Sequence, residues 1–400
     1  MNPVNPFPAV LIGGPPHSGK SVLVHVLTLA LRDRQIDHYV LRATPDGEGD
    51  WANVAEQSLV QTLRRKGKFN PEFVSSTVSY LQNRQIPLLV DVGGRPTADQ
   101  QALFSLCTHA ILLVGERADE PGRYEQDMDE WQAMMTRQHV PVIAVLRSVL
   151  EGASAVTSAD SPITGTISGL ERGRTVSNEL VELLVTRLTA VLTGSGIDIA
   201  THHQDIAPDG LFVHLPRALQ TLRPNATEWL PSDLAALRTL IPAGVALAVY
   251  GRAPTWAYVQ MALHTGEEPV WFFNTRVGWM TLPHLPIVRE LHEDVQERQP
   301  GWFVIQHQKA DYTVLTFTAT GQNLDPQQPH LLPFPDPQPS VGLILSGKMP
   351  QWLMAAAAKQ LFPGLPQRPY LAIYQPHLNG AVVVASNHPD YPIGHVVASE

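Results

Sequence analysis

The chain has 400 residues, 44% of them apolar, and its 28 Lys and Arg against 37 Asp and Glu give a formal net charge of −9. This length and apolar content predict two to three domains, each with its own hydrophobic core. The negative charge argues against binding to long nucleic acid, which depends on many Lys and Arg contacts. The single cysteine, Cys107, excludes an intramolecular disulfide and a cysteine-rich zinc site, and its apolar neighbours predict an inert core thiol.

The first residues contain no basic region followed by an apolar core, and no apolar run reaches the length of a membrane span. We therefore expect a cytoplasmic protein without a membrane partner. A small anionic ligand held by local cations remains compatible with the negative net charge.

The most informative motif lies at residues 13–21, which read Gly-Gly-Pro-Pro-His-Ser-Gly-Lys-Ser. An apolar run precedes the motif and a helix-like run follows it, which is the strand–loop–helix order of a phosphate-binding loop (P-loop). In such a loop Lys20 would reach the β and γ phosphates and the Ser21 hydroxyl would hold Mg²⁺. The motif predicts ATP and Mg²⁺ as cofactors, with ATP bound by Gly14, Ser18, Gly19, Lys20 and Ser21.

Two acidic positions belong to this interpretation. The apolar run 87–92 carries Asp91, which would stand near Mg²⁺ or its waters at the carboxyl edge of a parallel sheet. Asp46 follows the second predicted strand and is a candidate base that would activate an acceptor hydroxyl, as in P-loop kinases. A flexible acidic loop is the alternative for Asp46.

Strand-like and helix-like runs alternate through the first part of the chain. The predicted strands are 9–12, 38–41, 88–92, 110–114 and 141–146, and the predicted helices are 21–32, 54–66, 71–83, 127–137 and 176–192. This alternation predicts a parallel sheet with helices on both faces. We expect this P-loop domain to span residues 1–195, with a linker starting at Gly194.

The rest of the chain repeats itself weakly, since 246–256 aligns with 342–352. Each copy reads as a strand, a turn with Gly and a cation, and a Pro near a helix start. Hairpin-like stretches, 211–215 and 312–318, precede the copies. The sequence thus predicts an α/β protein: a P-loop parallel-sheet domain followed by two tandem small Rossmann-like modules, at 205–295 and 300–400.

The runs 344–353, 372–377 and 380–386 resemble the small Csx-type CRISPR-associated ring nucleases of type III systems. The likeness covers about the last hundred residues well and the preceding module more faintly. It implies Rossmann-like modules that pair, bind cyclic tetra-adenylate and cleave it with Mn²⁺, which ends an antiviral signal.

The resemblance also implies site residues. The family's strand ends in Asp-Pro-Arg with a histidine upstream, whereas this chain has Gln375-Pro376-His377 in one module and Asn274-Thr275-Arg276 in the other. Arg276 matches the arginine, and His264 stands near the upstream histidine. Because both expected aspartates are amides, a Mn²⁺ site is in question. Two readings remain open: metal-free cleavage by a 2′-hydroxyl, with His264, Arg276 and His377 as catalytic candidates, or a sensor that only binds.

Arg252 and Lys348 occupy equivalent places before a helix start, where a phosphate could be received. With Asn274 and Gln375 they form the candidate ligand-binding set; solvated turn cations are the alternative. Trp256 and Trp352 lie at the first turn of each helix, where core packing is favoured over stacking on adenine.

The sequence as a whole predicts an ATP-binding accessory protein of CRISPR antiviral defence, with ring-nuclease (phosphodiesterase, hydrolase) activity on cyclic oligoadenylate and with ATP controlling assembly or closure. We expect a homo-oligomer. Two alternatives stay open: a P-loop kinase of a small nucleoside-like or nucleotide-like substrate, and a catalytically inactive cyclic-oligoadenylate sensor.

Overall fold

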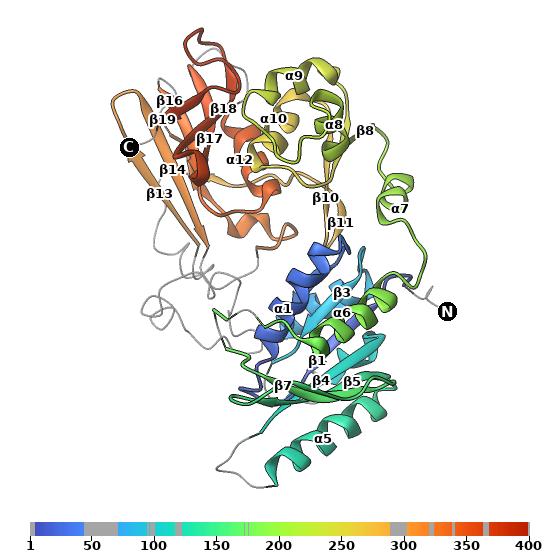
Figure 1. Ribbon diagram of the computed structural model, residues 1–400. Helices are drawn as coiled ribbons and strands as arrows, with labels where there is room; N and C mark the ends of the chain where they lie inside the picture. Colours follow the sequence, from blue (N-terminus) through green and yellow to red (C-terminus); the bar gives the residue numbers. More distant parts are fainter. Residues whose placement is uncertain are drawn as a thin grey trace. The chain divides into compact units, whose positions relative to one another are not determined.

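The structure is a computed structural model with an α/β fold, as predicted (Figure 1). It describes residues 5–43, 71–93, 96, 101–116, 122–171, 173–174, 176–288, 302–319, 324–337, 341–362 and 368–398. Asp46 and the predicted helix 54–66 lie outside these ranges. The chain divides into two compact units: Met1–His203 with Thr275–Gly278, and Gln204–Asn274 with Trp279–Glu400. Among the described residues, no helix combines the length and apolarity needed to cross a bilayer.

The first unit is built on a seven-stranded sheet. Its strands are β1 (Ala9–Gly13), β2 (Tyr39–Arg42), β3 (Leu88–Asp91), β4 (His109–Gly115), β5 (Val142–Val149), β6 (Ala155–Ser158) and β7 (Ile163–Ser168). They are ordered β2-β3-β1-β4-β5-β7-β6, and all neighbours are parallel except β6 with β7. The five predicted strands are confirmed as β1–β5. Strands β6 and β7 were not predicted. Strand β6 has no buried position to produce an apolar signal, whereas β7 alternates buried and half-buried positions.

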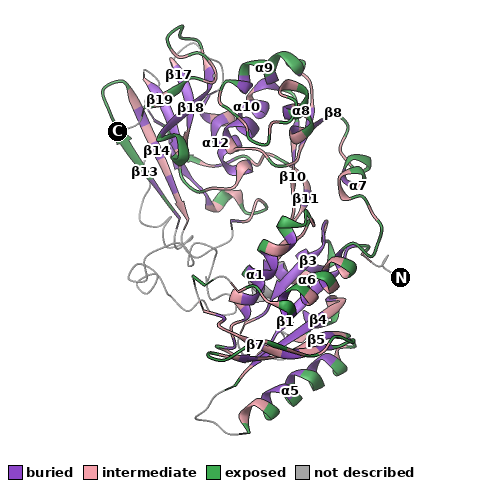
Figure 2. Cartoon of the chain, viewed as in Figure 1, coloured by how far each residue is buried: buried purple, intermediate pink, exposed green. Residues whose placement is uncertain are grey.

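Helices cover both faces of this sheet, as the alternation predicted. The elements are α1 (Lys20–Asp33), α3 (Pro71–Gln82), η2 (Phe104–Leu106), α5 (Arg123–Arg137), α6 (Glu179–Leu192) and α7 (Ile199–Asp205). Residues of α1 and α6 enter one core cluster and residues of α3 and α5 enter another, and Figure 2 shows the exposed outer side of α5. Helix α6 begins later than expected because Asn178 caps it, accepting from the Val181 N–H.

The second unit contains two larger sheets. The four-stranded sheet has the order β11-β10-β9-β8, with β8 (Leu211–His214), β9 (Leu247–Tyr250), β10 (Val270–Asn274) and β11 (Gly278–Thr281). Its helices are α8 (Leu215–Leu222), α9 (Asp233–Leu240) and α10 (Thr255–His264). The hairpin expected at 211–215 is wrong, because β8 pairs in parallel with β9 and the chain turns directly into α8, with Pro216 in its first turn.

The six-stranded sheet has the order β13-β14-β16-β17-β18-β19. Its elements are β13 (Trp302–Gln308), β14 (Tyr312–Ala319), β16 (Gly342–Ser346), α12 (Gln351–Leu361), β17 (Tyr370–Gln375), η4 (Pro376–Leu378), β18 (Gly380–Ser386) and β19 (Val396–Ala398). Strands β14, β16 and β17 are parallel, and β13 forms the expected hairpin with β14. A separate pair joins β12 (Ile287–Val288) to β15 (Phe334–Pro335), after η3 (Pro329–Leu331).

Helices α10 and α12 pack against each other, and one core cluster draws on both sheets. Each helix is preceded by a proline at its N-cap, Pro254 or Pro350, and carries a tryptophan as its second residue. Trp256 and Trp352 are 2% and 3% exposed, which confirms that they pack in the core. The two segments between 205 and 400 thus share one core.

Candidate functional site

The loop between β1 and α1 is shaped by two glycines. Gly14 has φ +148°, and a Cβ at this position would lie 1.9 Å from the Leu113 carbonyl oxygen. Gly19 has φ +89° and is the N-cap of α1. Side chains are disfavoured at both positions by contact as well as by conformation, because a Cβ at Gly19 would lie 2.9 Å from the Leu170 Cβ. The loop therefore leaves the central part of the sheet and enters α1 through positions that require glycine.

The ammonium of Lys20 lies against this loop. Its Nζ donates to the Pro15 carbonyl at 2.6 Å and is 3.5 Å from Ser18 Oγ. Ser18 and Lys20 are 2% and 6% exposed. A buried ammonium beside a loop and the N-terminus of a helix is an arrangement that favours an anion.

A hydroxyl and a carboxylate meet beside the same loop. Ser21 Oγ donates to Asp91 Oδ2 at 2.9 Å, and Asp91 is 5% exposed. Asp91 ends β3, where it is paired in register with Ile12 of β1. Hydroxyl and carboxylate oxygens are ligands that Mg²⁺ prefers, so these two residues fit a Mg²⁺ ion held beside a triphosphate.

In the second unit, cations and amides stand at the carboxyl ends of neighbouring parallel strands. Arg252 and Lys348 are exposed, and each follows a glycine of positive φ, Gly251 at +98° and Gly347 at +127°. Asn274 ends β10, the neighbour of β9, and Gln375 ends β17, the neighbour of β16. Because carboxyl ends of parallel strands share one edge, each sheet brings a cation and an amide to the same edge.

The three catalytic candidates are not brought together. His377 is exposed in η4, directly after Gln375. Arg276 belongs to the first unit by its contacts, and its guanidinium carbon lies 4.1 Å from the centre of the Tyr80 ring. His264 ends α10, where its carbonyl accepts from the Gly244 N–H, ahead of the start of β9. His264 therefore lies at the opposite end of the strands from Asn274.

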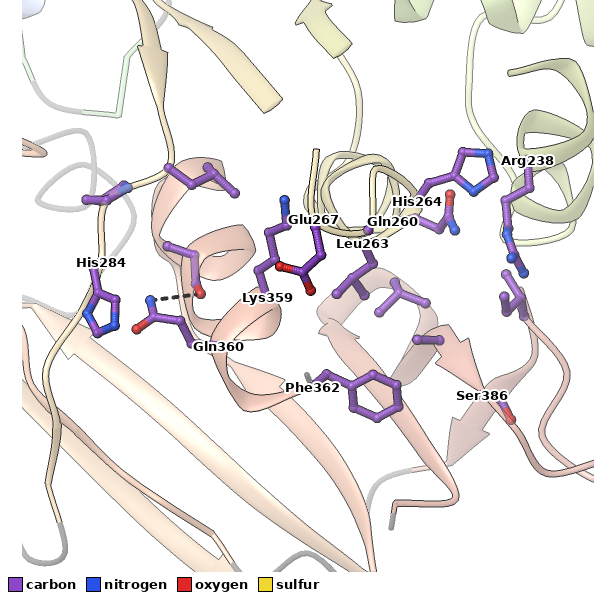
Figure 3. A pocket seen from close by; sticks show the side chains of 17 residues that line it. Arg238, Gln260, Leu263, His264, Glu267, His284, Lys359, Gln360, Phe362 and Ser386 are labelled. Carbon is purple, nitrogen blue, oxygen red and sulfur yellow. Dashed lines mark hydrogen bonds between the residues drawn. The ribbon is translucent and has the colours of Figure 1, made fainter. Parts of the chain in front are cut away.

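A cavity of about 580 Å³ opens where α9, α10, α12 and β18 meet (Figure 3). Its polar lining includes Arg238, Gln260, His264, Glu267, Lys359 and Gln360. Of these only His264 was a candidate from the sequence. The sequence gives a weak sign of Gln260, which is a single amide within an otherwise largely apolar helical run. The other polar lining residues are brought together by tertiary packing alone.

Burial shifts the pKa of Lys359, which lines this cavity, and that of Cys107 in the first unit. Burial lowers the pKa of Lys359, opposed by the negative charges of Glu267 and Glu268, and its Nζ donates to Thr265 Oγ1 at 3.0 Å and the Glu268 carbonyl at 3.1 Å. Cys107 is 7% exposed and burial raises its pKa to about 12, opposed by Arg84. A thiol with so high a pKa is a poor nucleophile, in agreement with the inert core cysteine that was predicted.

Fold and sites together define an α/β protein with a glycine-shaped, anion-favouring loop in one unit and, in the other, a cation and an amide at the carboxyl edge of each of two sheets. Residues 317–398 match a family model described as "CRISPR-associated protein (Cas_csx3)". The match runs from within β14 to the end of β19 and supports a CRISPR-associated protein. A comparison with curated proteins found no similar sequence.

Proposed function

We propose that this CRISPR-associated chain binds cyclic oligoadenylate, such as cyclic tetra-adenylate, in its second unit and ATP with Mg²⁺ in its first. The family match at 317–398 is the observation that carries the proposal, because it contains Lys348, Gln375 and His377 at one sheet edge. Cyclic oligoadenylate is proposed as the ligand because this segment resembles the type III ring nucleases.

The loop at 13–21 supports the nucleotide part of the proposal. Lys20 and the N-terminus of α1 would hold the phosphates, and Ser21 with Asp91 would hold Mg²⁺. Bound Mg²⁺ would neutralise phosphate charge. ATP would then bias assembly or closure of the second unit around its ligand, which we expect to involve a homo-oligomer.

The segment 205–295 would act as a second module of the same kind. Its β9 and α10 match β16 and α12 in the positive-φ glycine, the following cation, the N-cap proline and the buried tryptophan. Packing of α10 on α12 would replace, within one chain, part of the pairing that single-module relatives need between chains.

Cleavage of the ring would proceed without metal in the second unit, because the amides of Asn274 and Gln375 are neutral and do not fit a Mn²⁺ site that depends on carboxylates. A ribose 2′-oxygen would attack the adjacent phosphorus as the bond to the 5′-oxygen breaks, leaving a 2′,3′-cyclic phosphate and a 5′-hydroxyl. His377 would take the 2′-hydroxyl proton, water would protonate the departing 5′-oxygen, and Lys348 would stabilise the negative charge that develops on the phosphate oxygens.

The test is incubation of the full chain with labelled cyclic tetra-adenylate, with and without ATP and Mg²⁺, resolving bound, cleaved and phosphorylated species. We expect linear products, and at least tenfold weaker binding in Lys348→Ala, as for a lost charge-assisted phosphate contact. Lys309→Ala is the matched control, since Lys309 is also an exposed lysine. An unchanged, tightly bound ring would favour the inactive sensor, which the two amides also support; absence of binding would overturn the proposal.

A further inference from the structure

The cavity at the junction of α10 and α12 contains a buried polar atom without a partner. Gln260 is 2% exposed and lines the cavity, and its Oε1 has no hydrogen-bond partner among the described residues. Leaving a buried carbonyl oxygen without a hydrogen-bond donor is energetically unfavourable, because the oxygen loses its hydration on burial and gains nothing in return. The side chain therefore has an unused acceptor in a space large enough for a small ligand.

Helix packing does not require an amide at this position. Counted from the tryptophans at 256 and 352, Gln260 in α10 corresponds to Ala356 in α12, which lines the same cavity. Ala356 is also buried, so a small apolar side chain is sufficient on the partner helix. The cost of burying Gln260 is thus unexplained by packing.

A second acceptor follows from the tautomer of His264. His264 is 8% exposed, and its Nε2 lies 2.8 Å from the Ile241 carbonyl oxygen. A carbonyl can only accept, so Nε2 must carry the proton, and in the neutral ring Nδ1 is left as an acceptor. Figure 3 shows Gln260 and His264 next to each other on the Arg238 side of the cavity. A ligand group that donates hydrogen bonds fits this end.

The end of the cavity that contains Gln260 and His264 also carries positive charge and adjoins a second cavity. Arg238 is exposed and forms no ion pair with any residue that the structure describes. A neighbouring cavity of about 500 Å³ shares Arg238, His264 and Ser386 with the first. Leu263, Leu282 and Phe362 supply apolar walls. A cavity with apolar walls, an unpartnered amide oxygen and a guanidinium at its rim suits an aromatic base joined to an anionic group.

We propose that this cavity is a binding site for an adenine mononucleotide, with the amide of Gln260 accepting from the base's exocyclic amino group and Arg238 binding its phosphate. An amide edge is the usual partner of the adenine edge. The choice of adenine over another amino-bearing base rests on the proposed function. The site is distinct from the strand-end cations, because the C-terminus of α10 lies at the opposite end of the sheet.

The test is calorimetric titration of the full chain carrying Lys20→Ala, without Mg²⁺, so that the first unit contributes little. AMP should bind, and IMP, which has a carbonyl in place of the amino group, should bind about tenfold or more weakly. Gln260→Ala should bring the AMP and IMP affinities to within about twofold of each other. Gln360→Ala should preserve the ratio, because that amide is occupied by the Ala356 carbonyl and the Leu285 N–H.

The proposed contact between Arg238 and the phosphate is tested by a separate pair of variants. Arg238→Ala should weaken AMP but not adenosine, while Arg217→Ala, another exposed helical arginine, should change neither. Equal affinities for AMP and IMP in the parent chain, or no AMP binding at millimolar concentration, would overturn the inference even if Gln260→Ala did not fold. If AMP binding depends on Gln260 but the chain does not bind cyclic tetra-adenylate, the nucleotide site in this cavity would be supported and the proposed function would be rejected.

Discussion

The hydroxyl of Ser21 and the carboxylate of Asp91 are joined by a 2.9 Å hydrogen bond across 70 positions of the sequence. The bond links the first turn of α1 to the end of β3, so the two strongest sequence candidates for a Mg²⁺ site lie in contact. The pairing of β1 with β3 brings them there, because it places Ile12 beside Asp91.

Removing that hydroxyl should weaken nucleotide binding more than it weakens the fold. We expect Ser21→Ala to lower the affinity for ATP with Mg²⁺ by about tenfold or more, and the free energy of unfolding by only about 1 kcal/mol. Titration with a fluorescent ATP analogue measures the first and thermal unfolding the second. Ser21→Thr, which keeps the hydroxyl, is the control; equal affinity in all three chains would contradict a Mg²⁺ role.

Gly14 should tolerate no side chain. Gly14→Ala would place a Cβ 1.9 Å from the Leu113 carbonyl oxygen at φ +148°, and we expect a loss of about 3 kcal/mol in unfolding free energy, with loss of ATP binding. Gly122→Ala is the matched control, since φ is +79° there but no described residue would lie within 4 Å of the added Cβ. This control substitution should lower the free energy of unfolding by about 1 kcal/mol. Equal losses in urea unfolding would show that contact with Leu113 is unimportant.

His203 should make stability depend on pH in the acid range. It is fully buried, with Nε2 donating to the Gln85 carbonyl at 2.6 Å, and burial lowers its pKa from 6.5 to about 4, only partly opposed by that hydrogen bond. As pH falls from 6.5 towards 4, the unfolded chain gains a proton that the folded chain excludes, so the stability present above pH 6.5 is lost.

The measurement is the thermal midpoint of the first unit at pH 7 and pH 5. The drop between these pH values should be smaller in His203→Asn than in the parent chain. His25→Asn, at an exposed position of α1, should keep the parent's drop. A drop of the same size in His203→Asn would show that another group governs the acid sensitivity.

Restoring carboxylates should test whether a metal site has been lost. Gln375→Asp and Asn274→Asp would return the residue that the Csx-type pattern carries at the ends of β17 and β10. If the strand ends are otherwise intact, Mn²⁺ should increase cleavage of cyclic tetra-adenylate at least tenfold in the variants and not in the parent. Gln375→Asn keeps a neutral amide and is the control. Mn²⁺ stimulation of the parent chain would contradict metal-free chemistry.

Local signals in the sequence predicted most of the first unit. An apolar run needs no distant partner to be recognised as a strand, so β1–β5 could be located, whereas β6 could not, because it is a short edge strand with no buried residue. The parallel pairing of β8 was missed for a related reason. Its sequence shows a short strand before a turn, and only the partner strand decides whether that turn closes a hairpin or begins a helix.

The sequence by itself determined the 13–21 loop, the carboxylate at 91, and the matching glycine, cation, proline and tryptophan positions of the last two hundred residues. Each is a pattern of neighbours along the chain. Tertiary structure alone decided that Arg276 packs on Tyr80, that His264 lies away from Asn274, and that Gln260 and Arg238 share a cavity. These relationships depend on how helices cross and which strands pair, and contacts between distant residues leave no local pattern from which they could be read.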